Sequence, residues 1–227
     1  EFAKRKMRLC FSKTGTAVYI SHLDLMRTFQ RAFLRAELPV RHTEGFNPHA
    51  FVSIALPLSV GFSSVCELLD FDLEDETPVE SVPGRLNCAL PDGIRVSGCY
   101  ASQRPIRDLM YIAFDIQLIY DNGIPENAGK DLDILFAQGN LTVLKKSKKR
   151  KKAGKETEVN IAPLIQRISF AEENGILHCS AVLRAQDPGL NPRYLIKVIE
   201  TYAPALAPDF SRYHRNSVYD RDLLRFF

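Results

Sequence analysis

The chain lacks a long apolar segment and the short motifs that identify several common enzyme classes. No apolar run approaches the roughly 20 residues that a membrane-spanning helix needs, and the first residues do not form a signal peptide. There is no glycine-rich nucleotide-binding loop, no G-x-S-x-G sequence and no H-E-x-x-H pair. We therefore expect a cytoplasmic protein without membrane contact, and the enzyme classes that depend on these motifs are unattractive.

Cysteine is scarce and scattered. None of the five cysteines forms a C-x-x-C pair, and all stand in apolar contexts: Cys10, Cys66, Cys88, Cys99 and Cys179. This pattern is typical of small buried thiols in a reducing compartment, so no disulfide framework is expected. No pair of histidines has the spacing that directs two imidazoles at one ion, and we predict neither a metal site nor a cofactor.

The 227 residues, 45% hydrophobic and 25% charged, suffice for one large or two small domains. The net charge of +3 hides a strong asymmetry, because residues 145–155 hold eight basic residues and no acidic one. Removing those eight charges leaves −5 for the rest of the chain. Positive potential is therefore concentrated in one run and a few local stripes.

A capped helix and a turn-rich loop organise the first quarter of the chain. Ser21 followed three residues later by Asp24 is typical of a helix N-cap, and apolar residues at three- and four-residue steps predict a helix over residues 22–36. Pro39 ends this helix. A second helix face repeats arginine every four residues, at Arg27, Arg31 and Arg35.

The loop that follows, RHTEGFNPHAF, carries turn formers at Gly45 and at Asn47-Pro48, so its polar groups should be held out on a constrained surface. Four roles stay open: a small-ligand, phosphate or metal site; acid–base chemistry by histidine; structural capping; and recognition of a ligand or RNA. The candidate recognition residues are Ser12, Lys13, His22, Arg27, Arg31, His42, Glu44, Asn47 and His49.

Four segments, SKTG, ISHLDLMR, EGFNPH and ALPLSVGFSS, together resemble the N-terminal half of the radical-SAM-linked protein family. The resemblance covers residues 7 to about 75, and in the second half only the layout and RYHRNSVY are similar. It implies a bacterial protein encoded beside, or fused to, a radical S-adenosylmethionine enzyme as its partner. Such an enzyme needs closely spaced cysteines to hold an iron–sulfur cluster, and this chain has none, so it can only serve one.

Pattern and turn signals predict an α+β protein made of two tandem ferredoxin-like (βαββαβ) units, residues 1–104 and 105–227. For the first unit we expect strands at 7–11, 51–56, 66–73 and 94–100, with helices at 22–36 and 79–90. For the second we expect strands at 110–119, 141–146, 176–184 and 212–219, with helices at 128–137 and after Asn191. The stripe of the last helix should be buried at Leu195, Val198, Ile199 and Tyr202.

The basic run contributes a separate set of candidate phosphate contacts: Lys145, Lys146, Lys148, Lys149, Arg150, Lys151 and Lys152. As structure it resembles a solvated hairpin tip that self-repulsion keeps extended. As function, lysines near a phosphate backbone give salt-sensitive attraction without sequence preference. Contact with RNA or DNA, a merely solubilising loop and contact with acidic lipid remain open.

Two weaker patterns concern sheet faces. Tyr213, Arg215 and Tyr219 alternate along the last strand and should share one face, where they either stack bases or simply pack. The acidic cluster of Asp70, Asp72, Glu74 and Asp75 should form a solvated strand edge that discourages aggregation.

Three functions fit these features. The first is a non-catalytic module that binds RNA, such as tRNA or rRNA, and presents it to a radical S-adenosylmethionine enzyme. The second is a metal-independent ribonuclease, resembling CRISPR RNA-processing proteins, that uses His22, His42 or His49. The third is a pure protein adaptor without nucleic acid.

Overall fold

The computed structural model describes residues 4–146 and 156–227, except for the side chain of Lys146. It is an α+β structure that divides into two compact units, Glu1–Asp108 and Leu109–Phe227, here called the N-terminal and C-terminal units. The division lies four residues beyond the boundary expected from the sequence. Every named strand pair described is antiparallel.

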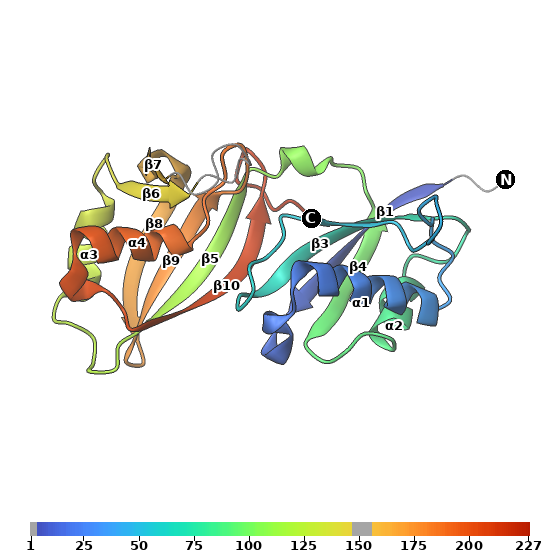
Figure 1. Ribbon diagram of the computed structural model, residues 1–227, viewed down its shortest axis with the longest axis horizontal. Coiled ribbons are helices and arrows are strands. Elements are labelled where there is room, and N and C mark those ends of the chain that lie inside the picture. The colour runs from blue at the N-terminus through green and yellow to red at the C-terminus, as the bar shows by residue number, and fades with distance from the viewer. Residues whose placement is uncertain (1–3, 147–155) are drawn as a thin grey trace. The chain divides into compact units, whose positions relative to one another are not determined.

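The N-terminal unit alternates strands and helices in the order expected from the sequence (Figure 1). Its elements are β1 (Arg5–Lys13), η1 (Gly15–Tyr19), α1 (His22–Arg35), β2 (Val52–Ala55), β3 (Ser63–Leu73), α2 (Ser81–Asn87), β4 (Ile94–Ala101) and η2 (Ile106–Asp108). Within it the strands pair in the order β4-β1-β3-β2. Since β3 is paired on both sides, the expectation that Asp70 and Asp72 mark a strand edge is wrong.

Apolar side chains from one face of this sheet meet both helices in a single core. Alternate residues of β1 and β3 point into it, and α1 contributes Leu25, Phe29 and Phe33 while α2 contributes Val82 and Leu86. Phe29 lies edge-on to Phe11 with ring centroids 4.7 Å apart. Because these side chains are almost fully buried, the burial of their apolar surface is what holds α1 against the strands.

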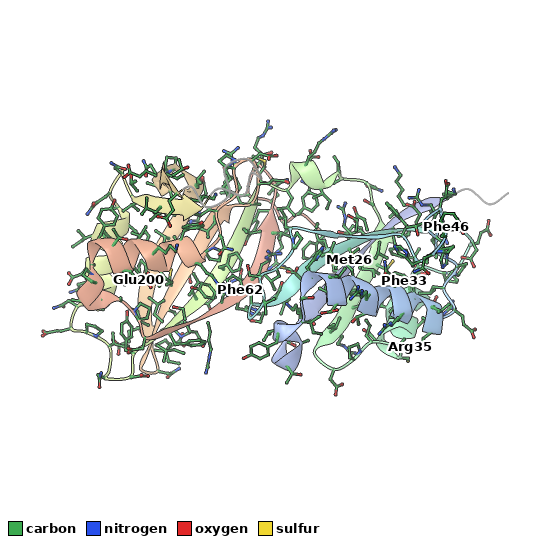
Figure 2. All side chains as sticks on the ribbon, in the orientation of Figure 1. Met26, Phe33, Arg35, Phe46, Phe62 and Glu200 are labelled. Carbon is green, nitrogen blue, oxygen red and sulfur yellow. The ribbon has the colours of Figure 1, made fainter. Side chains whose placement is uncertain are left out.

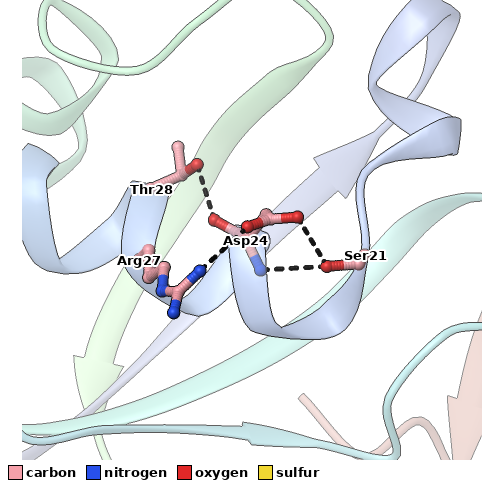
Figure 3. A network of polar contacts seen from close by, with 4 residues as sticks. All are labelled: Ser21, Asp24, Arg27 and Thr28. Atoms are coloured by element: carbon pink, nitrogen blue, oxygen red, sulfur yellow. Dashed lines mark hydrogen bonds and ion pairs between the residues drawn. The ribbon is translucent and has the colours of Figure 1, made fainter.

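The start of α1 is fixed by the predicted N-cap, which the structure confirms (Figure 3). The Ser21 hydroxyl accepts a hydrogen bond from the Asp24 backbone N–H at 3.1 Å and donates one to the Asp24 carboxylate at 2.7 Å. Arg27 approaches the same carboxylate at 3.4 Å. The cap satisfies one of the orphan N–H groups of the first turn and places a negative charge where the helix dipole favours it.

Two side chains of α2 form hydrogen bonds with the backbone of neighbouring elements. The Arg85 guanidinium donates to the carbonyl oxygens of Ala36 and Glu37, which follow the last turn of α1. The Asn87 side chain exchanges two hydrogen bonds with the backbone of Val96 on β4, at 2.8 and 2.9 Å. Both contacts satisfy backbone groups that would otherwise lack partners.

The C-terminal unit repeats the alternation with one insertion (Figure 1). Its elements are β5 (Tyr111–Ile119), α3 (Ala128–Phe136), β6 (Thr142–Lys146), β7 (Glu156–Asn160), η4 (Ala162–Leu164), β8 (Ile165–Glu173), β9 (Ile176–Arg184), α4 (Arg193–Tyr202), η5 (Pro204–Leu206) and β10 (Phe210–Tyr219). The strands pair as β10-β5-β9-β8, whereas β6 and β7 form a separate hairpin. The prediction of 141–146 as the second strand of this sheet is therefore wrong, since β8 takes that place.

Two further expectations for this unit are wrong. Tyr202 is 44% exposed and exchanges hydrogen bonds with the backbone of Thr142, so it does not belong to the buried stripe of α4. A bulge between Arg215 and Ser217 breaks the alternation of β10, which leaves Tyr213 opposite Ile116 but Tyr219 opposite Tyr111. The two tyrosines consequently lie on different faces of the sheet.

Candidate functional site

The EGFNPH segment is the tip of a small hairpin that projects from the N-terminal unit. Its arms are joined by a bridge between His42 and Ala50 and by backbone hydrogen bonds from Thr43 to His49 at 2.8 Å and from Phe51 to Arg41 at 2.7 Å. Gly45 has a φ of +124°, a conformation that other residues rarely adopt. The turn formers in the sequence therefore do produce a constrained loop.

Phe46 occupies the tip of this loop and is fully exposed (Figure 2). Its neighbours on both sides are also exposed, so no apolar side chain of its own loop shields the ring. Phe46 was not among the predicted recognition residues. The sequence did offer a signal for it, because this phenylalanine stands between a glycine and Asn-Pro, in a turn with no helical or strand periodicity. An aromatic ring presented this way contributes little to the core and is free to contact a ligand.

His49 helps to hold the loop rather than standing free in it. Its Nδ1 lies 3.0 Å from the Asn47 carbonyl oxygen and 3.3 Å from the Thr43 hydroxyl, and its backbone N–H donates to the same hydroxyl at 3.2 Å. With Nδ1 donating to Asn47, Nε2 is left as an acceptor. His42, Glu44 and Asn47 are exposed side chains around the tip.

The basic face of α1 lies beside the base of this hairpin. The Gln30 side-chain amide donates to the Ala50 carbonyl oxygen at 3.4 Å, which ties the middle of the helix to the hairpin. Arg27 and Arg31 are exposed on either side of Gln30 in the sequence. His22, exposed at the first residue of the helix, stands about 12 Å along the helix axis from Gln30 at 1.5 Å per residue, so it is displaced from the hairpin.

Ser12 and Lys13 do not join this surface. Lys13 is 1% exposed and pairs with Ser64 on β3 and Ile94 on β4, because it is the last residue of a central strand. Ser12 is half-buried, and its hydroxyl lies 3.4 Å from the Arg95 carbonyl oxygen. Lys13 is thus buried among strands instead of exposed beside the hairpin, and its role in recognition stays a prediction. Among the predicted recognition residues, the hairpin carries His42, Glu44, Asn47 and His49, with Phe46 added, and the adjoining helix α1 carries Arg27 and Arg31.

In the C-terminal unit, the basic run joins β6 to β7. Lys145 lies in β6 with its ammonium 5.7 Å from the centre of the Tyr194 ring, and Lys146, the last residue of β6, pairs with Glu156, the first residue of β7. The other five candidate phosphate contacts, Lys148, Lys149, Arg150, Lys151 and Lys152, lie outside the described residues. A cleft of about 640 Å³ beside the β6–β7 hairpin is lined by Glu156, Glu158, Lys197, Glu200 and Tyr202, among others.

Two of the cysteines, Cys10 and Cys99, are held as thiols by burial. Burial raises the pKa of the Cys10 thiol to about 11 and that of Cys99 to about 12, so both stay protonated near neutral pH. Burial also raises the pKa of Tyr100, which neighbours Cys10 and Arg8. Across residues 4–146 and 156–227, no three His, Cys, Asp or Glu side chains gather as a metal site, and no helix is long and apolar enough to cross a membrane.

Comparison with curated proteins gives no significant match. Among solved structures, one match is an unknown protein from Galdieria sulphuraria, at 8% sequence identity over 94% of this chain and 99% of that chain. Its TM-score of 0.27 is too low to support any inference. The sequence comparison is more informative, because residues 6–192, which include both the hairpin and the basic run, match one family throughout. The chain belongs to DUF2344, a family of uncharacterized proteins conserved in bacteria.

Proposed function

We propose that this protein is a non-catalytic RNA-binding module that presents an RNA, such as tRNA or rRNA, to a radical S-adenosylmethionine enzyme. The observation that carries the proposal is Phe46, a fully exposed aromatic ring on a loop held in shape by hydrogen bonds. Stacking of an unpaired base on such a ring contributes about 1–3 kcal/mol and tolerates any base. A ring whose position is fixed before binding loses less entropy when the complex forms.

The charges around the loop suit the same ligand. Arg27 and Arg31 are exposed on the helix that Gln30 ties to the hairpin, so they add positive charge to this side of the unit that a phosphate backbone can contact. The basic run between β6 and β7 adds attraction that depends on salt but not on sequence. Glu44 is the one acidic side chain between residues 41 and 51.

The architecture and the partner complete the proposal. In both units the strand order corresponds to 4-1-3-2 of a βαββαβ element sequence, which supports two tandem ferredoxin-like domains with the β6–β7 hairpin inserted in the second. Ferredoxin-like domains are used by RNA-recognition modules, which is a fold-level analogy only. The radical S-adenosylmethionine partner rests on the resemblance of SKTG, ISHLDLMR, EGFNPH and ALPLSVGFSS.

The test is equilibrium binding of the full chain to fluorescein-labelled tRNA and to a single-stranded oligonucleotide. Phe46→Ala should weaken both complexes about 10-fold, whereas Leu224→Ala, which removes another exposed apolar side chain, should leave them unchanged. Equal affinities for the two variants would refute the role of the loop. Cleavage of the RNA during the assay would instead favour the ribonuclease alternative.

The partner needs its own measurement. The purified radical S-adenosylmethionine enzyme from the same organism should be retained by the immobilised chain, and more of it should be retained when RNA is present. Retention that ignores RNA, together with no RNA binding by the chain, would favour the pure adaptor.

A further inference from the structure

The sheet of the C-terminal unit has one face covered by helices and one that is not. On the covered face, Ile116, Leu118, Leu177 and Cys179 are at most 2% exposed, and α3 and α4 each bury one apolar face of their own. The residues between these positions are half-buried or exposed. Since side chains alternate along a strand, those residues form the opposite, helix-free face.

The registers of β10, β5 and β9 arrange this helix-free face in three rows. The first row is apolar, the second carries hydrogen-bonding groups and the third is polar. The first row holds Phe210 and Ile119, and Ile176 joins it if the β5–β9 register is continued by one residue beyond Leu118 and Leu177. The second row holds Arg212, Gln117 and His178, and the third holds His214, Asp115 and Ser180. With strands about 4.8 Å apart and rows about 6.8 Å apart, the three rows cover the area that two or three bases need on a sheet.

His178 and Asp115 form a pair on this face, with Nδ1 and Oδ1 3.5 Å apart. That Asp115 oxygen is buried, and no hydrogen bond satisfies it within the described residues. The Asp115 side chain as a whole is 40% exposed, so part of its negative charge remains at the surface, where it suits a base edge better than a phosphate. With Nδ1 of His178 facing this carboxylate, Nε2 of a His178 that is protonated at Nδ1 is an acceptor.

The first two rows, in which Phe210 and Arg212 are exposed and Gln117 is half-buried, match the chemistry of an unpaired nucleic acid strand. Phe210 is 59% exposed and offers a ring for a base. Gln117 can both donate to and accept from a base edge, and the exposed Arg212 guanidinium suits a phosphate or a ring face. A protein docking surface of this area would be expected to be apolar at its centre, whereas the central row of this face carries hydrogen-bonding groups.

We propose that this face, centred on Phe210, Arg212, Gln117 and His178, is a second RNA-binding surface that takes an unpaired stretch of two or three nucleotides. The inference rests on the proposed function and adds to it a preference for single-stranded over duplex RNA. Duplex RNA hides its base faces, so it cannot stack on Phe210.

The experiment compares full-chain variants by fluorescence anisotropy with two probes, a 10-nucleotide oligouridine and a 10-base-pair RNA duplex. Phe210→Ala should weaken oligouridine binding about 10-fold and duplex binding less than 2-fold. Arg212→Gln should weaken oligouridine binding and lower the slope of log K against log salt by about one. The matched controls, Ile134→Ala and Lys130→Gln, remove an exposed apolar group and a positive charge from α3 on the helical layer and should change neither complex.

The outcomes separate this inference from the proposed function. If the wild-type chain binds neither probe, both fail. If it binds RNA while Phe210→Ala and Arg212→Gln behave like their controls, only this inference fails. If the two variants instead lose the radical S-adenosylmethionine enzyme and keep RNA, the face is a protein interface and the inference is wrong. Thermal melts exclude misfolding, and Gln117→Ala replaces any variant that melts early.

Discussion

Arg8 and Asp70 face each other on β1 and β3 and form a two-point ion pair, with Nε 2.6 Å from Oδ1 and Nη2 2.9 Å from Oδ2. The third arm of the Arg8 guanidinium donates to the Arg104 carbonyl oxygen at 2.9 Å, so the pair also fastens the segment that follows β4. The Arg8 side chain is 2% exposed and that of Asp70 is 33% exposed. The charge of Arg8 therefore depends on Asp70 for compensation.

Removing Asp70 should destabilise the protein strongly. Asp70→Ala leaves a buried guanidinium without its carboxylate and should cost about 3 kcal/mol, at the low end for buried pairs because Asp70 is partly exposed. Urea unfolding measures the loss. Asp108→Asn is the control, since the Arg107–Asp108 pair is exposed and 4.0 Å long and should contribute under about 0.5 kcal/mol. A similar loss of stability in both variants would show that the buried Arg8–Asp70 pair contributes no more than an exposed ion pair.

Gly93 should tolerate no side chain. Its φ is +84°, and an added Cβ would overlap the Thr14 carbonyl oxygen and lie 2.9 Å from the Ala17 Cβ. The Gly93 carbonyl oxygen also accepts a hydrogen bond from the Thr14 N–H at 2.8 Å. We expect Gly93→Ala to cost at least about 2 kcal/mol in denaturant unfolding. Gly98→Ala, where an added Cβ meets nothing within 4 Å, should stay within about 0.5 kcal/mol of wild type.

The cysteines should differ sharply in reactivity. Cys88 is exposed, whereas Cys10 is buried with a pKa raised from 9.0 to about 11. Only thiolates react with iodoacetamide, so at pH 8 Cys88 should be alkylated first and Cys10 only after unfolding. Mass spectrometry of native and urea-unfolded samples checks the order. Rapid native alkylation of Cys10 would contradict the burial of that strand.

The same shift has a consequence for stability against pH. Because the folded pKa of Cys10 lies above the unfolded value, the unfolded chain releases its proton first as pH rises. The contribution of Cys10 is fully present below pH 9 and should be lost between about 9 and about 11. Unfolding of Cys10→Ala should show less decline over that interval than wild type, and an identical decline would assign the effect to other groups.

Elements with local signals were predictable from the sequence. The cap at Ser21 and the apolar periodicity placed α1 to within one residue, and the alternation of β9 gave its bounds as Ile176–Arg184. The second strand of the C-terminal sheet was not predictable in this way. Both β6 and β8 have strand character, and which of them pairs with β9 is decided by contacts that are distant in the sequence.

The candidate site was predictable in part. Turn formers correctly indicated a constrained loop, but they did not show that His49 is used to hold it or that Phe46 is its exposed tip. The helix-free face of the C-terminal sheet was missed because its residues come from three strands. The bulge after Arg215 also shifts the face of every residue beyond it, which alternation alone cannot reveal.

Neutralising the basic run should weaken RNA binding uniformly. Replacing Lys145, Lys146, Lys148, Lys149, Arg150, Lys151 and Lys152 by Gln removes phosphate contacts and leaves base contacts in place. The slope of log K against log salt should fall by about 0.7 for each phosphate of a single strand that the variant no longer neutralises. Titrations with two RNAs of different sequence measure it. An unchanged slope would assign the run to solubility.

His49 should act through Phe46. His49→Ala removes the Nδ1 interactions with Asn47 and Thr43, so the loop should hold the Phe46 ring less well and RNA binding should weaken several-fold. Stability should change by less than about 1 kcal/mol because the side chain is exposed. By contrast, Phe29→Ala, in the core, should cost about 3–5 kcal/mol. Thermal melts separate the two classes.

A double-mutant cycle decides how His49 contributes. If it only positions the ring, Phe46→Ala combined with His49→Ala should bind RNA no worse than Phe46→Ala alone, since nothing remains to be positioned. Leu224→Ala is the control, because it removes an exposed side chain that lies outside the hairpin and the α1 face. Additive losses for Phe46 and His49 would instead mean that the imidazole touches the RNA itself.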